Sequence, residues 1–466
     1  MRLKFSAQAV LEFGPSHLQV TQAYYAKYNG INEILLATPS ILEAFHRDAS
    51  GPLLAGVRKR AAQFTSDQLL RTILVMEIEE LTYRATVIRI DDSRFLRCFV
   101  GLHDQPMMDF TTLNKVYKAI RPETWRKINR MLAQYARDGG HIRGESLRVD
   151  TTAYETNVHY PTDSSLLWDG YRVVARLIER VRAVDGDVVG SRRLQVRKVK
   201  RAVQQIARLA PQRTTDPRKM KRLYKVLLGR VEALLAWAGD VRTEGQARLR
   251  SGRYDEMTGL TLGGMLDAMG EFEQLTRRVV DQARRRVLDG EVVPNADKLF
   301  SLFEPHTELL IRGKAGKAVE FGHMVLLQQV ENQFISDYEV FEKRPSDESL
   351  VDDLLKRHAR MFGHPPTNFT ADKGFYKSRE QLAKLRETIA NVSIGKKGSR
   401  TLEEIQQEHD PIFRTLQRFR AGIEGTISYL KRCYKMFRCL YRSFTTFCGS
   451  VGCHIFAHNL VVLTRR

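Results

Sequence analysis

The sequence is poor in cysteine, and it lacks both a long apolar run and the features of a secretory leader. Its five cysteines agree with a reducing compartment. The four near the C-terminus lack the C-x2-C pairs common in structural zinc sites, so we expect buried small hydrophobes there. No run of about eighteen apolar residues occurs, which predicts that no helix spans a bilayer. The N-terminal residues contain no continuous apolar core followed by a small-residue cleavage site. These absences predict a cytoplasmic protein without a membrane partner.

Acidic residues are fewer than basic ones. The chain of 466 residues has 54 Asp and Glu against 75 Lys and Arg, which gives a formal net charge of +21 and a pI near 9.8. This excess favours a polyanionic partner, and nucleic acid more than an anionic membrane surface. A soluble protein that is merely basic is the alternative. Hydrophobic residues make up 43%, enough for packed cores, and the length suggests about two to four structural units.

Residues 1–140 have a mostly helical pattern. A Thr-x-x-Gln capping box at Thr65 precedes an apolar run, Gly101 ends a short helical segment, and Pro122 suits the first position of a helix. Further helices are predicted over 83–90, 93–100, 112–120 with Thr111 as cap, and 122–137. Short helices joined by tight turns fit either a helix-turn-helix-like module or a dimerisation bundle.

Alternating apolar and polar residues predict strands in the remainder of the chain. Asp150 lies in the middle of the first strand, and Asp372 lies at the carboxyl end of a strand in a β-α-β unit, where open α/β sheets form their sites. A carboxylate buried in a strand is costly unless it is paired, hydrogen-bonded or bound to a cation. The predicted strands are 146–154, 317–330, its hairpin partner 334–341, 368–372 and 391–394.

A charge-rich segment with helical periodicity covers residues 185–297. It contains repeated basic clusters, and a helix over 164–184 with Asp163 as its cap precedes it. Each cluster alone is equally consistent with a solvated helix face, but their repetition in one segment favours a surface that faces phosphates. The first cluster includes Arg197, Lys198, Lys200 and Arg201.

A late helix over 413–431 carries a third distinctive carboxylate. Arg420, Glu424 and Lys431 fall within about 40° of one another around its axis. Alone, this is an amphipathic helix with an ordinary Arg–Glu pair four residues apart. With Asp150 and Asp372, however, Glu424 completes a set of three acids in a basic protein. Such a set suggests two divalent ions, Mg²⁺ or its substitute Mn²⁺, and in-line displacement at phosphorus.

The sequence resembles bacterial insertion-sequence transposases of the DDE superfamily, in an ISNCY-like group, over nearly its whole length. The resemblance rests on Val149-Asp150-Thr151-Thr152, on Thr370-Ala371-Asp372-Lys373-Gly374, and on Arg420, Glu424 and Lys431. The last three fit the Tyr-x2-Arg-x3-Glu-x6-Lys signature of related families. Gln417 occupies the position of the tyrosine, which leaves the three acids unaffected.

The resemblance implies an α/β fold, namely an RNase H-like mixed sheet flanked by helices. A helical N-terminal domain (1–140) would bind DNA ends or dimerise, and a catalytic domain (141–466) would be interrupted after its first strand by the basic helical insertion 185–297. Asp150, Asp372 and Glu424 would be the catalytic, Mg²⁺-binding residues. The implied DNA-binding residues are Arg420, Lys431, Lys373, Arg197, Lys198, Lys200 and Arg201.

The implied activity is Mg²⁺-dependent cleavage of double-stranded DNA at the terminal inverted repeats of the element. Transfer of the 3′-hydroxyl strands to target DNA follows, in a homodimer or a higher synaptic oligomer. The alternatives are an RNase H-like nuclease without strand transfer and a non-enzymatic basic DNA-binding protein, such as a regulator or a domesticated transposase. Three carboxylates argue against the latter, because a binding protein gains nothing from acids near phosphate.

Overall fold

The structure, a computed structural model, describes residues 18–50, 64–211, 216–314 and 317–465. Residues 1–17 and 51–63 of the predicted N-terminal domain therefore lie outside the described residues. The chain divides into two compact units, which we call the sheet unit (Met1–Asn157 with Gly322–Arg466) and the helical unit (Val158–Phe321). Each unit is built on an apolar core of its own.

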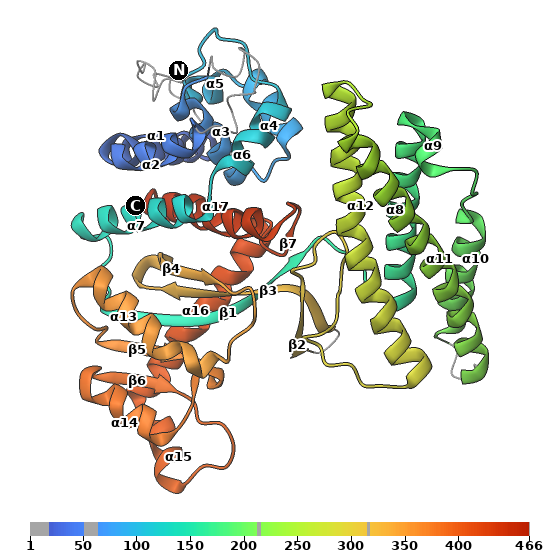
Figure 1. The fold of residues 1–466 in the computed structure, drawn as a ribbon. Helices are drawn as coiled ribbons and strands as arrows, with labels where there is room; N and C mark the ends of the chain where they lie inside the picture. The colour runs from blue at the N-terminus through green and yellow to red at the C-terminus, as the bar shows by residue number, and fades with distance from the viewer. Residues whose placement is uncertain (1–17, 51–63, 212–215, 315–316, 466) are drawn as a thin grey trace. The chain divides into compact units, whose positions relative to one another are not determined.

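Helices form the N-terminal part of the sheet unit (Figure 1). Thr65 and Gln68 make the predicted capping box, and Gly101 ends α5 in the left-handed conformation, with φ 76°. The predicted cap of α6 was wrong: the Asp109 carboxylate caps this helix, accepting from the Thr111 backbone N–H at 2.8 Å. The helices are α1 (Gln19–Ala37), α2 (Pro39–Ala49), α3 (Ser66–Ile78), α4 (Tyr83–Asp92), α5 (Arg94–Val100), α6 (Phe110–Ala119) and α7 (Pro122–Asp138).

The sheet confirms the predicted fold class. β1 (Ser146–Thr156) lies at its centre, antiparallel to β3 (Lys317–Gln329) and parallel to β5 (Asn368–Ala371). β4 (Ile335–Val340) pairs antiparallel with β3, and β6 (Asn391–Ile394) pairs parallel with β5. The resulting order, β4-β3-β1-β5-β6, is that of the RNase H-like fold which the resemblance implies. Two further strands, β2 (Glu308–Lys314) and β7 (Arg438–Cys439), pair with β3 and β1.

Helices surround this sheet, so both faces of β1 are mostly buried. α16 (Pro411–Cys433) packs against β1, β5 and β6, and α17 (Phe444–Leu463) packs against α7 and β4. The amide of Asn459 joins α17 to β4 through the backbone of Ile335, at 3.0 and 2.8 Å. The remaining helices of this part are α13 (Val351–Phe362), α14 (Arg379–Thr388) and α15 (Leu402–His409).

One helix in the described part of the chain, α17, is long and apolar enough to cross a membrane. In the folded protein, 83% of the most apolar 18-residue stretch of this helix is buried. The apolar composition of α17 is therefore also that expected of a core helix, because its apolar surface packs against α7 and β4.

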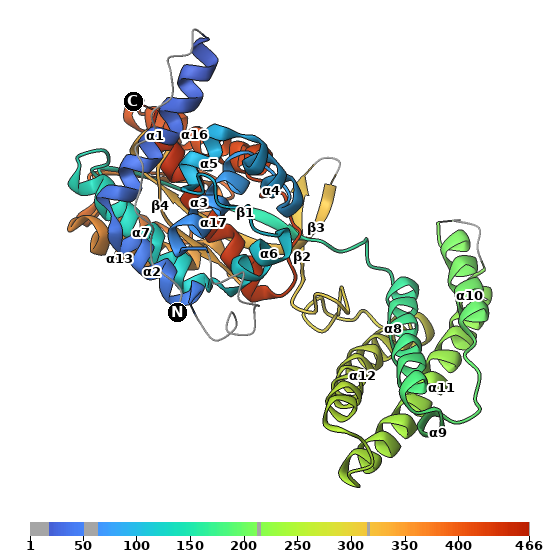
Figure 2. The same cartoon turned by 90° about the horizontal axis from the view of Figure 1, so that it is seen from above.

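The helical unit is a group of long helices, whose apolar sides share one core (Figure 2). The chain enters it at Val158 and leaves it at Phe321, so the unit includes α8 as well as the predicted segment 185–297. The predicted cap of α8 was wrong, because Thr162 caps it and Asp163 is its first residue. The helices are α8 (Asp163–Val184), α9 (Gly186–Val189), α10 (Val196–Leu209), α11 (Pro217–Arg250) and α12 (Glu256–Ala283).

Asp163 instead joins the two ends of the helical unit. Its buried carboxylate accepts from Gln282 Nε2 and from Arg286 Nη1, both at 2.8 Å. These partners lie more than a hundred residues later in the chain, on α12 and the π-helical turn Arg284–Asp289 that follows it. A charged group that is buried this deeply is tolerated because both of its oxygens are paired.

Candidate active site

The register between β1 and β5 brings two of the three predicted acids to the same level of the sheet. The strands are parallel, with Ser146 opposite Asn368 and Arg148 opposite Thr370. Continuing this register by two residues sets Asp150 level with Asp372, the first residue after β5. Neighbouring strands lie about 4.8 Å apart and residues at the same level point to the same face. Both carboxylates are partly exposed.

A tight turn follows Asp372 and fixes its carboxylate. The backbone N–H of Gly374 donates to Asp372 Oδ1 at 2.7 Å. A methyl group at Gly374 would lie only 2.8 Å from that oxygen and 2.9 Å from Oδ2 of a further acid, Asp347. Glycine therefore lets two carboxylates from different loops approach the same point of the backbone.

Asp347 belongs to a short helical turn, Asp347–Leu350, ahead of α13. Its Oδ1 accepts from the Thr151 hydroxyl at 3.4 Å, which connects it to the residue after Asp150. Burial raises the pKa of Asp347 above its usual range; Arg344 opposes this, and the charge of Asp372 adds to it. A fourth carboxyl group thus lies near Asp372 and beside Thr151.

Arg148 fixes α16 against the sheet. Its Nη1 donates to the Phe419 carbonyl at 2.5 Å, and its guanidinium lies 4.4 Å from the centre of the Phe419 ring. A methyl group at Gly422 would lie 2.2 Å from the same nitrogen, so this glycine admits the arginine. Burial lowers the pKa of Arg148 to about 10. The helix that carries Glu424 therefore contacts β1 at Arg148, two residues before Asp150.

Glu424 lies on α16 with its side chain 61% exposed, and it accepts from Arg420 at 3.1 Å. Gln417, at the position of the signature tyrosine, accepts from Arg420 Nε at 3.2 Å and donates to Ser393 Oγ at 2.9 Å. Gln417 thus connects the end of β6 to the cation that holds the third acid. Lys431 follows in the last turn of the same helix.

The three predicted acids do not form one closed cluster in this conformation. Among the residues that the structure describes, no three His, Cys, Asp or Glu side chains are grouped closely enough to hold a metal ion. The register of β1 and β5, continued by two residues, sets Asp150 level with Asp372, whereas Glu424 is paired with Arg420.

The predicted DNA-binding cations are mostly solvent-exposed. Lys373 is exposed directly after Asp372, and Arg197, Lys198, Lys200 and Arg201 are exposed on α10. Val199, Ala202 and Ile206 form the buried side of that helix. The basic face of α10 belongs to the helical unit.

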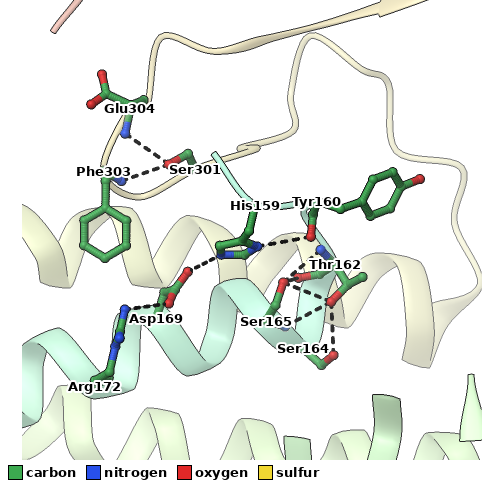
Figure 3. A network of polar contacts seen from close by, with 10 residues as sticks. All are labelled: His159, Tyr160, Thr162, Ser164, Ser165, Asp169, Arg172, Ser301, Phe303 and Glu304. Carbon is green, nitrogen blue, oxygen red and sulfur yellow. Dashed lines mark hydrogen bonds and ion pairs between the residues drawn. The ribbon is translucent and has the colours of Figure 1, made fainter. Parts of the chain in front are cut away.

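A polar network lies where the chain enters the helical unit (Figure 3). His159 Nε2 contacts Asp169 Oδ2 at 2.7 Å, and Arg172 donates to the other oxygen of Asp169 at 3.1 Å. Burial alone would lower the pKa of His159, but the hydrogen bond and charge of Asp169 outweigh it and raise that pKa. Ser301 Oγ accepts from the backbone N–H groups of Phe303 and Glu304, both at 3.1 Å. These contacts order the entry of α8 and the chain that returns to the sheet.

Two residues of the site were absent from the sequence prediction. Asp347 has no distinguishing signal, because an acid in the first turn of a helix is ordinary. Arg148 had a signal: it is a cation inside an apolar strand, on the same face as Asp150. Its burial shows that it contacts α16 rather than solvent.

Residues 283–460 match the family model of the transposase DDE domain. No curated protein and no solved structure matches the chain. The matched range includes Asp372 and Glu424 and leaves out Asp150, which precedes the helical unit in sequence. The match covers less than half of the chain and does not resolve a subgroup. Together with the RNase H-like strand order, it supports a DDE-type transposase of the insertion-sequence kind.

Proposed function

We propose that this chain cuts DNA at the terminal inverted repeats of its own element and joins the freed 3′-hydroxyl ends to target DNA. The proposal rests on the parallel register of β1 and β5, which, continued by two residues, would set Asp150 level with Asp372, and on the neighbouring helix α16, which bears Glu424. In a chain of net charge +21, partly exposed acids at one edge of a sheet are better explained by chemistry at phosphate than by stability.

The site suits divalent ions with oxygen ligands. Carboxylates are the ligands that Mg²⁺ prefers, and Gly374 lets the carboxylates of Asp372 and Asp347 lie close together. Asp150, Asp372 and Glu424 would hold two Mg²⁺ ions, with Mn²⁺ as a substitute. When bound, such ions supply charge stabilisation at phosphorus and activation of the attacking oxygen.

The protein's own cations have separate roles in the proposal. Arg420 holds the exposed Glu424 side chain until the acid turns to the metal site, and Gln417 keeps Arg420 in place through Ser393. Lys373, Arg420 and Lys431 would neutralise phosphates near the cut. The basic face of α10 would add binding to the DNA ends in the cytoplasm at the nucleoid, and pairing of two ends would require a homodimer or a higher synaptic oligomer.

The test is a combined cleavage and strand-transfer assay on the element's own ends. With Mg²⁺, the unchanged chain should produce both nicked ends and joined products. Asp150→Asn and Asp372→Asn should each lower cleavage by roughly 1,000-fold, equivalent to about 4 kcal/mol, while gel-shift binding to the ends is retained. Glu424→Gln should show a similar loss.

The two alternatives give different products in the same assay. Cleavage without joined products would identify a nuclease, and salt-sensitive binding without any Mg²⁺-dependent cleavage would identify a non-enzymatic binder. Cleavage that persists unchanged in the double variant Asp150→Ala, Asp372→Ala would contradict the proposed site. Matching circular dichroism spectra confirm that the variants are folded.

A further inference from the structure

The sheet unit contains a second candidate site, a cavity of about 470 Å³ at the far end of β1. Its lining comes from the end of α3, the start of α4, α6, β1, the segment after α16, and α17. Tyr154 of β1 contributes to the wall four residues after Asp150, roughly 13 Å along the strand. The cavity is therefore separate from the candidate active site.

The walls of this cavity are aromatic. Tyr83, Tyr154, Tyr434 and Tyr441 all line it. The Tyr441 ring stacks on the buried Tyr117 at a centroid distance of 4.6 Å and an interplanar angle of 25°, which holds it in a fixed orientation. Rigid tyrosine rings offer flat apolar surface to a planar ligand, and stacking on such rings tolerates different bases.

A buried polar pair also lines the cavity. Glu77 Oε2 contacts His454 Nδ1 at 2.6 Å, and His454 Nε2 contacts the Tyr154 hydroxyl at 3.3 Å. The side chains of Glu77 and His454 are only 5% and 4% exposed. The Tyr117 hydroxyl donates to Glu77 Oε1 at 3.3 Å, so this pair is hydrogen-bonded within the protein and holds the rings of Tyr117 and Tyr154 in place.

Basic side chains also line this cavity. Lys118, Lys435, Arg438 and Arg442 line the cavity, compared with the acids Glu77 and Glu80. Lys118, Arg438 and Arg442 are exposed to solvent. The excess of positive charge at the rim favours an anionic group on the ligand, such as a phosphate.

The backbone is strained at the same place. Glu80 and Lys435 both line the cavity, and both have φ of 54° although neither is glycine. They are joined by a hydrogen bond from Lys435 Nζ to the Glu80 carbonyl. Ser443, next to Arg442, has φ of 74°. Strained residues that the surrounding structure holds in place are typical of ligand-binding sites.

We propose that this cavity binds a single nucleotide, with its base against the tyrosines and its phosphate at the cationic rim. The volume lies within the usual range for small-ligand sites, about 300–1,000 Å³. The same chemistry is presented by a free mononucleotide and by one unpaired nucleotide of a DNA strand. The proposal goes beyond the proposed function and does not depend on the cleavage chemistry.

The experiment uses the full chain and measures both sources. The four 5′-deoxynucleoside monophosphates are titrated by calorimetry, with the matching nucleosides and inorganic phosphate as partial ligands. In parallel, a DNA strand with one unpaired 2-aminopurine is titrated by fluorescence. Binding of the monophosphates, at least 10-fold tighter than nucleoside or phosphate alone, indicates a free ligand. A fluorescence change without monophosphate binding indicates a nucleotide of the strand.

Two rim variants and a control locate the binding. The double variant Lys118→Glu, Arg442→Glu should weaken either signal by at least 10-fold. Lys115→Glu changes an exposed cation of the same helix, α6, that does not line the cavity, and should leave the signal within twofold. Absence of both signals in the unchanged chain, or equal losses in the double variant and the control, would overturn the proposal.

Discussion

In the sheet unit Arg148 is buried against Phe419, and Asp150 lies level with Asp372 through strand pairing. In the helical unit four cations of α10, namely Arg197, Lys198, Lys200 and Arg201, face solvent, and an apolar core holds the helices together. The charged groups of the sheet unit are fixed in position by hydrogen bonds and strand register, so a single substitution there should change the rate of DNA cleavage. The exposed cations of α10 act together through the electrostatic potential of the helix face, so their contributions to DNA affinity should add.

After loss of the acids themselves, the largest effect on activity should come from a methyl group added beside Asp372. Gly374→Ala inserts a methyl group 2.8 Å from Asp372 Oδ1 and 2.9 Å from Asp347 Oδ2, so one carboxylate must move. A displacement of that size lowers activity by roughly 100-fold, measured as Mg²⁺-dependent cleavage. Gly425→Ala is the control, since no atom lies within 4 Å of its added methyl group. Equal activities of the two variants would show that the close approach at Gly374 is unimportant.

The next effect should appear in the stability of the helical unit. Leu266 of α12 is 1% exposed, and a methyl group at Gly245 of α11 would lie 2.8 Å from its Cδ1. Leu266→Ala should cost about 2–5 kcal/mol and Gly245→Ala about 1–3 kcal/mol. The double variant should cost less than the sum, because the added methyl group enters the space that Leu266 vacates.

These costs are measured by chemical denaturation, with hydrogen exchange to assign the unfolding to residues 158–321. Gly229→Ala, also on α11, has no atom within 4 Å of its new methyl group and should not destabilise the unit. Strictly additive costs would mean that α11 and α12 do not pack as described.

The basic face of α10 should give a smaller effect on DNA binding. Replacing Arg197, Lys198, Lys200 and Arg201 with Ala removes exposed cations without touching the buried side of the helix. End binding should weaken by roughly 10–100-fold, and the slope of log affinity against log salt should fall by about 0.9 for each phosphate that the variant no longer neutralises. Matched changes at the exposed cations of α11, Arg218, Lys219, Lys221 and Arg222, control for net charge. Equal losses in both variants would mean that α10 has no specific part.

The smallest effect should be the pH dependence from His159. Its pKa is raised in the folded state by Asp169, so protonation stabilises the fold. The contribution is fully present below the unfolded pKa, about 6.5, and disappears as pH rises through the folded pKa. The His159 side chain is 52% exposed, so screening keeps the effect to well under about 1 kcal/mol. Melting curves of His159→Gln and the unchanged chain should differ at pH 5.5 and converge by pH 8; a constant difference would contradict this.

The sequence determined most of the elements and the strand positions of Asp150 and Asp372. Alternation around Asp150 and the strand ending at Asp372 follow from local patterns with a period of two, and all five predicted strands are present. Capping boxes, prolines and glycines likewise marked most helices, because these signals act over three or four residues. Caps that depend on competing side chains, at Asp109 and Thr162, were missed.

Only the tertiary structure decided which residues meet. The register that sets Asp150 level with Asp372 joins residues more than two hundred positions apart, and nothing local encodes it. The approach of Asp347 to Asp372, the seat of α16 on Arg148 and the contact of Gln417 with Ser393 depend in the same way on packing between distant segments. The local periodicity of the sequence specifies whether a segment is a helix or a strand. Which elements pack against each other is decided by the need to bury the apolar sides of all elements together.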